Sequence, residues 1–200
     1  MSYIKIIQFQ NATGKLKRLY DKVIGPNSHI DNVLAVHSLR PHTLEGHMAL
    51  YKNVLHHTSN TLPKWYLETI GTYISLINDC EYCAVHHSVG IKKNAESEEH
   101  YDLIIKAIET QDFESIFPDQ LLQGISYAVK LTMDHRNITD DDIESLREVG
   151  FTDGEILEIN QVSCYFNYVN RMVVGLGVQL EDSNIGLSPS SSKEADWSHN

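Results

Sequence analysis

Two cysteines and a histidine stand close together near the middle of the chain, at positions 80, 83 and 87. If the segment from Asp79 onward is helical, successive residues turn by about 100°, so Cys80, Cys83 and His87 share one face. Two thiols one helical turn apart can form a disulfide. An imidazole one turn further on can accept a proton or hold a water that does so. The spacing therefore favours thiol redox chemistry.

The start of that helix would favour the reactive form of a cysteine. Asn78, followed by Glu81 three residues later, has the form of a capping box, which predicts that a helix begins after Asn78. Cys80 would then occupy the second position of the helix, where unpaired N–H groups and the helix dipole stabilise negative charge. Because the thiolate is the nucleophilic form, this position is expected to lower the pKa of a thiol.

Spacing alone leaves two other interpretations of the cysteine pair open. Cys80, Cys83, His87 and Glu68 together offer the four ligands of a structural zinc site, although zinc ligands usually come in pairs from two separate elements. The pair can also be inert, since cysteine is often buried as a small apolar residue. We favour the redox interpretation over both.

Helical periodicity runs through the rest of the chain. Apolar residues recur at Leu44, Met48, Tyr51 and Leu55, which is the spacing of an amphipathic helix. The alternation typical of strands is largely missing, apart from residues 3–9, which suit a short strand or an extended arm. Further helical patterns cover residues 14–24, 65–77, 98–109, 119–133, 140–149 and 153–178. The sequence therefore predicts an all-α fold with the CxxC motif at the N-terminus of a central helix.

The composition is that of an ordinary globular protein. The 200 residues are 42% hydrophobic and 22% charged, which is enough to bury a sizeable core. A formal net charge of -11 argues against binding a nucleic-acid backbone, which needs clustered lysine and arginine. The N-terminus lacks the pattern of a secretory signal, and no window has the roughly 18 apolar residues of a membrane span. We therefore expect a cytoplasmic protein without nucleic-acid or membrane partners.

The domain organisation predicted is simple. Residues 1–182 are expected to form a single domain, in which residues 1–40 are an N-terminal extension. Residues 183–200 are rich in serine and polar side chains, which predicts a disordered tail. Cys164 lies in an apolar helical pattern and is expected in the core.

The remaining histidines follow no metal-ligand spacing beyond one adjacent pair. His86 points about 100° away from His87 on a helix and is expected to be solvated or at a subunit contact. Six more are interpreted as surface or interface residues: His29, His37, His42, His47, His56 and His57.

The cysteine motif resembles that of a known family. Glu68, Cys80, Cys83 and His87 form the pattern E-x11-C-x-x-C-x-x-x-H, which resembles the AhpD-like superfamily of alkylhydroperoxidase D and the carboxymuconolactone decarboxylases. The resemblance covers roughly residues 14–180. Its central motif is specific and its flanking motifs are weak. Three segments look like the peroxidase-related branch: Ser38-Leu39-Arg40-Pro41, Asn78 to His87, and Phe166-Asn167-Tyr168-Val169-Asn170-Arg171.

The resemblance implies an AhpD-like helical fold, assembly as a homo-oligomer and a thiol-dependent peroxidase. Cys83 would be the peroxidatic thiol and Cys80 the resolving thiol, with Glu68 and His87 as a proton relay. The implied partners are a peroxide substrate and a dithiol electron donor, and neither a cofactor nor a metal is implied. Tyr82 stands where well-characterised members have a histidine, so a lipoyl-type donor does not follow from the resemblance.

Two rival functions remain. One is a carboxymuconolactone decarboxylase-like enzyme, although that branch generally does without the cysteine pair. The other is a non-catalytic redox-sensing or zinc-binding module. By residue type alone, Glu68 suits the exposed face of an amphipathic helix better than a site, because glutamate is mostly exposed.

Overall fold

A computed structural model describes residues 2–25, 29–182 and 185, and these form helices with no β-strand among them. The predicted all-α class is confirmed. Residues 3–9 form no strand, and none of the described helices is long and apolar enough to cross a membrane. The helices are α1 (Gly14–Val23), α2 (Asn32–Ala35), α3 (Pro41–Tyr51), α4 (Lys64–Ile77), α5 (Glu81–Asn94), α6 (Glu98–Thr110), α7 (Asp119–Met133), α8 (Asp140–Glu148) and α9 (Asp153–Gly175).

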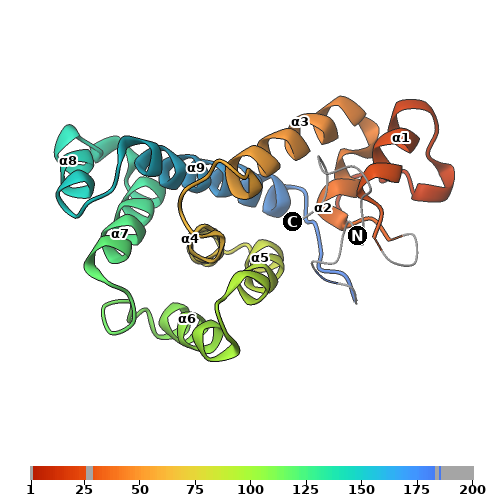
Figure 1. Ribbon diagram of the computed structural model, residues 1–200. Coiled ribbons are helices and arrows are strands. Elements are labelled where there is room, and N and C mark those ends of the chain that lie inside the picture. The colour runs from red at the N-terminus through yellow and green to blue at the C-terminus, as the bar shows by residue number, and fades with distance from the viewer. Residues whose placement is uncertain (1, 26–28, 183–184, 186–200) are drawn as a thin grey trace.

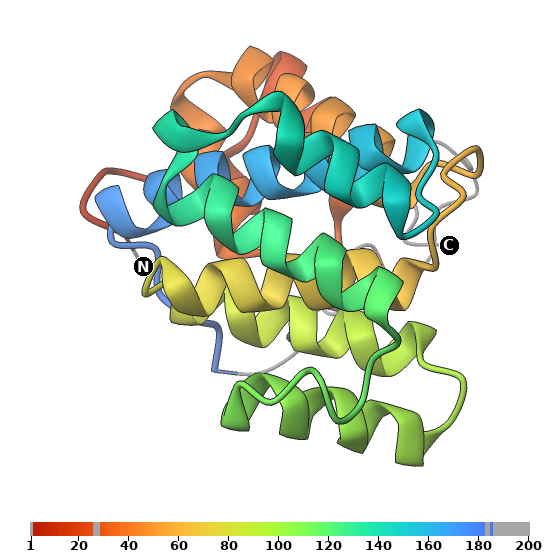
Figure 2. The same cartoon turned by 90° about the vertical axis from the view of Figure 1, so that its left-hand side faces the viewer.

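Helix α4 lies at the centre and is seen end-on in Figure 1. It packs against α5, α7 and α9, and Figure 2 shows α4, α5 and α6 stacked beside one another. A helix enclosed on several sides must be apolar over most of its surface, and α4 is buried at nine positions from Tyr66 to Ser75. Glu68 is one of these positions, so the fold places a carboxyl group inside the core.

Two glycines allow the helices around α4 to approach closely. A Cβ atom on Gly71 would lie 2.1 Å from the ring of Phe166, so only glycine lets α9 pack there. A Cβ atom on Gly90 would lie 2.6 Å from Cδ of Glu68. The side chain of Glu68 therefore occupies the space that a larger residue on α5 would need.

The N-terminal helices have a hydrophobic cluster of their own. It joins α1, the segment around α2 and the start of α3 through buried residues that include Leu16, Tyr20 and Leu44. The chain that follows α9 runs alongside this part, because the side-chain amide of Asn32 donates to the carbonyl of Gln179 at 2.9 Å. The predicted disordered tail, apart from Ile185, lies outside the described residues.

The turn between α4 and α5 differs from the expected one. Asn78 is the C-cap of α4, Asp79 adopts a left-handed conformation with φ of 52°, and Cys80 is the N-cap of α5. The N–H of Cys80 donates to the carbonyl of Ser75 and that of Asp79 to Leu76, which is the Schellman pattern. The predicted capping box at Asn78 was therefore wrong, because Asn78 ends α4 and its side-chain amide donates to Asn167 and Asn170 instead of capping α5.

Candidate active site

The two cysteines of the motif lie together at the start of α5. Both are buried and not joined by a disulfide, and their Sγ atoms are 2.6 Å apart. Cys80 occupies the N-cap rather than the expected second position, which leaves Cys83 in the first turn of the helix. A small movement of either side chain would bring the sulfurs to bonding distance, about 2.05 Å.

The pKa values of the two thiols are shifted in opposite directions. The hydrogen bond with Cys83 lowers the pKa of Cys80, and the backbone N–H of Cys83 adds to this effect against the cost of burial. The same hydrogen bond, followed by burial, raises the pKa of Cys83. The two thiols therefore titrate as a coupled pair, in which negative charge is favoured at Cys80 and disfavoured at Cys83.

Asn170 on α9 supports both thiols from the side, a role that sequence reasoning missed. It is 1% exposed, and its hydrogen bonds to Cys80 and Cys83 lower the pKa of each. Its amide donates to Oγ of Ser75, and its carbonyl oxygen accepts from Asn78. Asn170 belongs to one of the weak flanking motifs, which was the available signal for its importance.

Glu68 and His87 form a buried pair. Oε2 of Glu68 lies 2.6 Å from Nδ1 of His87, and Nε2 of His56 lies 3.7 Å from the other carboxylate oxygen. Burial lowers the pKa of His56 to about 4, although the Glu68 carboxylate opposes this effect. His56 is therefore neutral at pH 7 and can accept a hydrogen bond from a group in the adjoining cavity.

A cavity of about 180 Å³ opens beside these residues. Cys83, Glu68 and His87 all line it, whereas Cys80 lines a separate hollow formed with the end of α9 and the chain after it. The cavity that Cys83 lines has apolar and aromatic walls at Leu34, His47, Met48, Tyr51, Tyr165 and Val169. Tyr82 and His86 line it too, as do the charged residues Asp31, Lys64 and Lys93. Burial raises the pKa of Tyr51 and of Tyr165 well above 10, so both phenols stay protonated and can donate hydrogen bonds.

His86 pairs with a second buried carboxylate, Glu181, at 2.7 Å. Oε1 of Glu181 also accepts from the hydroxyl of Tyr82 at 2.8 Å and from the N–H of Asn32 at 2.7 Å. Burial by itself would raise the pKa of Glu181, but the hydrogen bonds from His86, Asn32 and Tyr82 lower it to about 2. Of the two alternatives expected for His86, solvation is wrong, because its side chain is 10% exposed and stacks on Tyr82, whereas a subunit contact stays a prediction.

Other expectations about exposure also failed. His37 and His47 are buried, with ring centroids 5.0 Å apart, and His56 is largely buried as well. His47 lies on the buried face of α3 with Leu44 and Met48, and this helical spacing could have revealed it. Cys164, in contrast, is exposed on α9 rather than in the core.

The four residues proposed as alternative zinc ligands are not gathered as a metal site requires. Among the residues that the structure describes, one group of three or more histidine, cysteine, aspartate and glutamate side chains has donor atoms mutually within 4.8 Å, and it is His29, Asp31 and Glu181. Cys80, Cys83, His87 and Glu68 do not form such a group, so the described structure does not favour the zinc alternative for the cysteine motif.

No protein-family model matches the sequence, and no curated protein is significantly similar to it. Solved structures do share its fold. The chain is similar to the alkylhydroperoxidase AhpD core of an uncharacterized peroxidase-related protein from Ralstonia eutropha JMP134, with a TM-score of 0.76, 22% identity and coverage of 93% of this chain and 95% of the other. For an uncharacterized peroxidase-related protein from Silicibacter sp. TM1040, the TM-score is 0.68 at 23% identity, over 84% and 83% of the two chains.

The debrominase Bmp8 has a similar structure too. Its TM-score is 0.65 at 16% identity, over 84% of this chain and 87% of Bmp8. A cysteine-to-alanine variant of Bmp8 has been solved in complex with 2,3,4-tribromopyrrole. At identities of 14–23% these likenesses establish the fold and not the reaction. The chain therefore has an AhpD-like helical fold, as its motif predicted.

Proposed function

We propose that the chain is a thiol-dependent peroxidase that works through a Cys80–Cys83 dithiol/disulfide cycle. One observation carries the proposal: Cys83 shares a cavity with the buried Glu68–His87 pair, and Cys80 lies directly behind it. A nucleophile, a proton carrier and a resolving thiol are thus close together, with room for a substrate. The site residues are those that the motif predicted.

In the first step, Cys83 attacks one oxygen of the peroxide. The O–O bond breaks, Cys83 becomes a sulfenic acid, and the other oxygen leaves as an alkoxide or hydroxide that takes up a proton. His87 and Glu68 are the groups we assign to carry the Cys83 proton to that leaving oxygen. A positioned proton carrier contributes about 10²–10⁴-fold to such a step.

In the second step, Cys80 attacks the sulfur of the Cys83 sulfenic acid. A disulfide forms, and hydroxide leaves and is protonated to water. An external dithiol then reduces the disulfide by exchange, so each cycle converts a peroxide and a dithiol into an alcohol, water and an oxidised donor. When the donor attacks Cys83, the backbone N–H of Cys83 and the side chain of Asn170 remain to stabilise the departing Cys80 thiolate.

Tyr82 bears on the choice of donor. Its hydroxyl donates to Glu181 and accepts from the N–H of Val33, so it is used within the fold. We therefore assign it no part in the proton relay, and the donor is specified only as a dithiol. Self-association is a further part of the proposal, supported by apolar side chains exposed along α9 at Leu157, Tyr168 and Val174.

Peroxide consumption measured with a panel of dithiol donors tests the activity. Wild-type protein is expected to turn over, Cys83→Ser to be inactive, and Cys80→Ser to react once without turnover. Cys164→Ser is the matched control, because Cys164 is a free cysteine exposed on α9, and it should behave as wild type. If neither motif cysteine is oxidised at millimolar peroxide, the peroxidase proposal is wrong.

Reductive dehalogenation of an aromatic ring is a second candidate. The observation in its favour is the aromatic wall that Tyr51 and Tyr165 give the cavity, with ring centroids 6.0 Å apart. In such a reaction, a carbon–bromine bond is replaced by carbon–hydrogen, bromide leaves, and the two thiols supply the electrons by forming a disulfide. Bromide release from 2,3,4-tribromopyrrole, in the absence of peroxide consumption, would favour this candidate over the first.

A further inference from the structure

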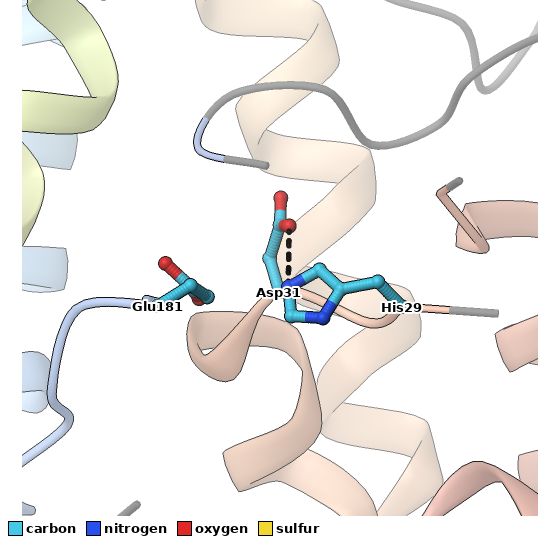
Figure 3. A group of neighbouring side chains, drawn as sticks. All are labelled: His29, Asp31 and Glu181. Carbon is cyan, nitrogen blue, oxygen red and sulfur yellow. Dashed lines mark ion pairs between the residues drawn. The ribbon is translucent and has the colours of Figure 1, made fainter. Parts of the chain in front are cut away.

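His29, Asp31 and Glu181 meet on the side of the molecule where the chain after α9 passes the N-terminal region. Figure 3 shows the three side chains converging, two from the segment before α2 and one from the chain after α9. One donor atom from each lies within 4.8 Å of the others. The group takes no part in the proposed thiol chemistry, although Asp31 also lines the cavity of Cys83.

The imidazole of His29 has a nitrogen without a hydrogen-bond partner. Nε2 is buried from water and makes no hydrogen bond among the described residues, and it lies 3.6 Å from Oδ1 of Asp31. That distance is too long for a hydrogen bond. Two ligands of a tetrahedral zinc ion, each 2.0–2.2 Å from the metal, are separated by about 3.3–3.6 Å. The spacing of His29 and Asp31 suits a shared ion better than a shared proton.

Asp31 directs its carboxylate away from its usual role. It is the N-cap of α2, a position where aspartate normally accepts hydrogen bonds from the first turn of the helix. Its side chain makes no such bond, while its backbone carbonyl accepts from Leu34 and Ala35. The carboxylate, in a residue that is 6% exposed, is turned toward His29 instead.

Glu181 is fixed in place and still has a lone pair to offer. A carboxylate has about four acceptor positions, two on each oxygen. Tyr82 and Asn32 both donate to Oε1, and His86 donates to Oε2, which leaves one position on Oε2. Metal-binding carboxylates are commonly oriented by hydrogen bonds of this kind.

We propose that His29, Asp31 and Glu181 bind a divalent transition-metal ion, with Zn²⁺ the best match. One imidazole nitrogen and two carboxylate oxygens are ordinary zinc ligands, and water would complete a tetrahedral shell. The ion would join the segment before α2 to the chain after α9 and so stabilise their association, with the water-filled position left open. Tyr82 and His86 would hold Glu181 in position without binding the ion themselves.

Zinc titration by calorimetry tests the site, in tag-free full-length protein carrying Cys80→Ser and Cys83→Ser. These two substitutions remove thiols that would bind zinc by themselves, which keeps the test independent of the proposed peroxidase. We expect one Zn²⁺ per chain and a rise in melting temperature, since an ion that binds only the folded state stabilises it. Lack of saturable binding at millimolar zinc would overturn the proposal.

Variants then locate the ion. His29→Ala and Asp31→Asn should abolish the binding and the thermal shift. Tyr82→Phe, which removes one hydrogen bond to Glu181, should weaken binding by roughly 10–100-fold. His135→Ala, at an exposed histidine on the distant turn after α7, is the matched control and should bind as the parent does. If Asp31→Asn does not fold, His29→Ala decides the matter, because the His29 side chain is 27% exposed and its loss should be tolerated. Unchanged zinc binding in His29→Ala would overturn the proposal.

Discussion

His86 and His87 are neighbours in the chain, yet each pairs with a different buried carboxylate. His87 binds Glu68, which lies 19 residues before it on the adjacent helix α4. His86 binds Glu181, which lies 95 residues further along the chain. The two pairs have almost the same hydrogen-bond length, 2.6 and 2.7 Å. Their surroundings are what separates them.

Both histidines line the cavity of Cys83, but of the two carboxylates only Glu68 lines it, whereas the oxygens of Glu181 accept hydrogen bonds from Tyr82, His86 and the N–H of Asn32. A carboxylate whose hydrogen bonds are already made by backbone and side-chain groups holds segments together. One that faces a cavity beside a thiol is available for proton transfer. We therefore expect Glu68 to matter for the reaction and Glu181 to matter for stability.

The sharpest contrast should come from Glu68→Gln and Glu181→Gln in single-turnover oxidation by peroxide. Glu68→Gln keeps the size of the side chain but removes its charge, and should slow the oxidation by about 10²–10⁴-fold. Glu181→Gln should stay within a few-fold of wild type. Equal losses in the two variants would show that the pairs are not functionally distinct.

For stability, in contrast to the reaction rate, we expect substitution of Glu181 to have a large effect. Glu181→Ala leaves donors on Tyr82, His86 and Asn32 without their charged acceptor, and should lower the free energy of unfolding by on the order of 2–4 kcal/mol. Glu109→Ala, at an exposed position of α6, is the control and should change it by less than about 0.5 kcal/mol. Urea denaturation measures both, and similar values for the two would contradict the structural role of Glu181.

Acid should destabilise the protein in two overlapping pH ranges. Burial lowers the pKa of His37 to about 4, of His47 to about 3 and of His56 to about 4. The unfolded chain binds protons at these histidines below about pH 6.5 while the folded chain does not, so stability falls from about pH 6.5 to 4. At pH 5 unfolding should take up about two to three protons.

Glu181 accounts for the loss of stability in the lower pH range. Its pKa is about 2 in the fold and near 4.5 when unfolded, so the stability that it contributes is present above about pH 4.5 and is lost as pH falls toward 2. In Glu181→Gln, the unfolding free energy should therefore no longer show the fall between about pH 4.5 and 2 that Glu181 causes. His37→Gln should reduce the proton uptake at pH 5 by about one proton. A stability that is flat between pH 6.5 and 4 would contradict the burial of the histidines.

The smallest effect is expected at the turn that positions Cys80. Asp79 has a positive φ, which costs an L-residue other than glycine roughly 1–2 kcal/mol and aspartate less than most. Asp79→Gly should therefore raise the unfolding free energy slightly, by less than about 1 kcal/mol, without changing the rate of peroxide reduction. A marked loss of stability would mean that the carboxylate of Asp79 has a role that its backbone conformation does not reveal.

Sequence patterns predicted the helices well and the site only in part. Glu68 and His87 were recognisable because their spacing to the cysteines repeats a family motif. Glu181 was not, because it follows the last helix, in chain without periodicity, and its partners are distant in sequence. The burial of His37 was missed because residue type predicts exposure, and tertiary packing overrode that tendency. The start of α5 was misplaced because a left-handed aspartate is an uncommon end to a helix.

The central claim is that access to the cavity, rather than thiol acidity, decides which cysteine reacts first. Cys80 has the lowered pKa, whereas Cys83 lines the cavity with Glu68 and His87. Sulfenic acid trapping in Cys80→Ser and Cys83→Ser, followed by peptide mapping, tests the effect of access, because each substitution removes the thiol–thiol hydrogen bond that sets the two pKa values apart. We predict rapid trapping at Cys83 in Cys80→Ser and little at Cys80 in Cys83→Ser. Faster trapping at Cys80 would contradict the account, and would place the reacting peroxide at the hollow beside Cys80 instead of in the cavity.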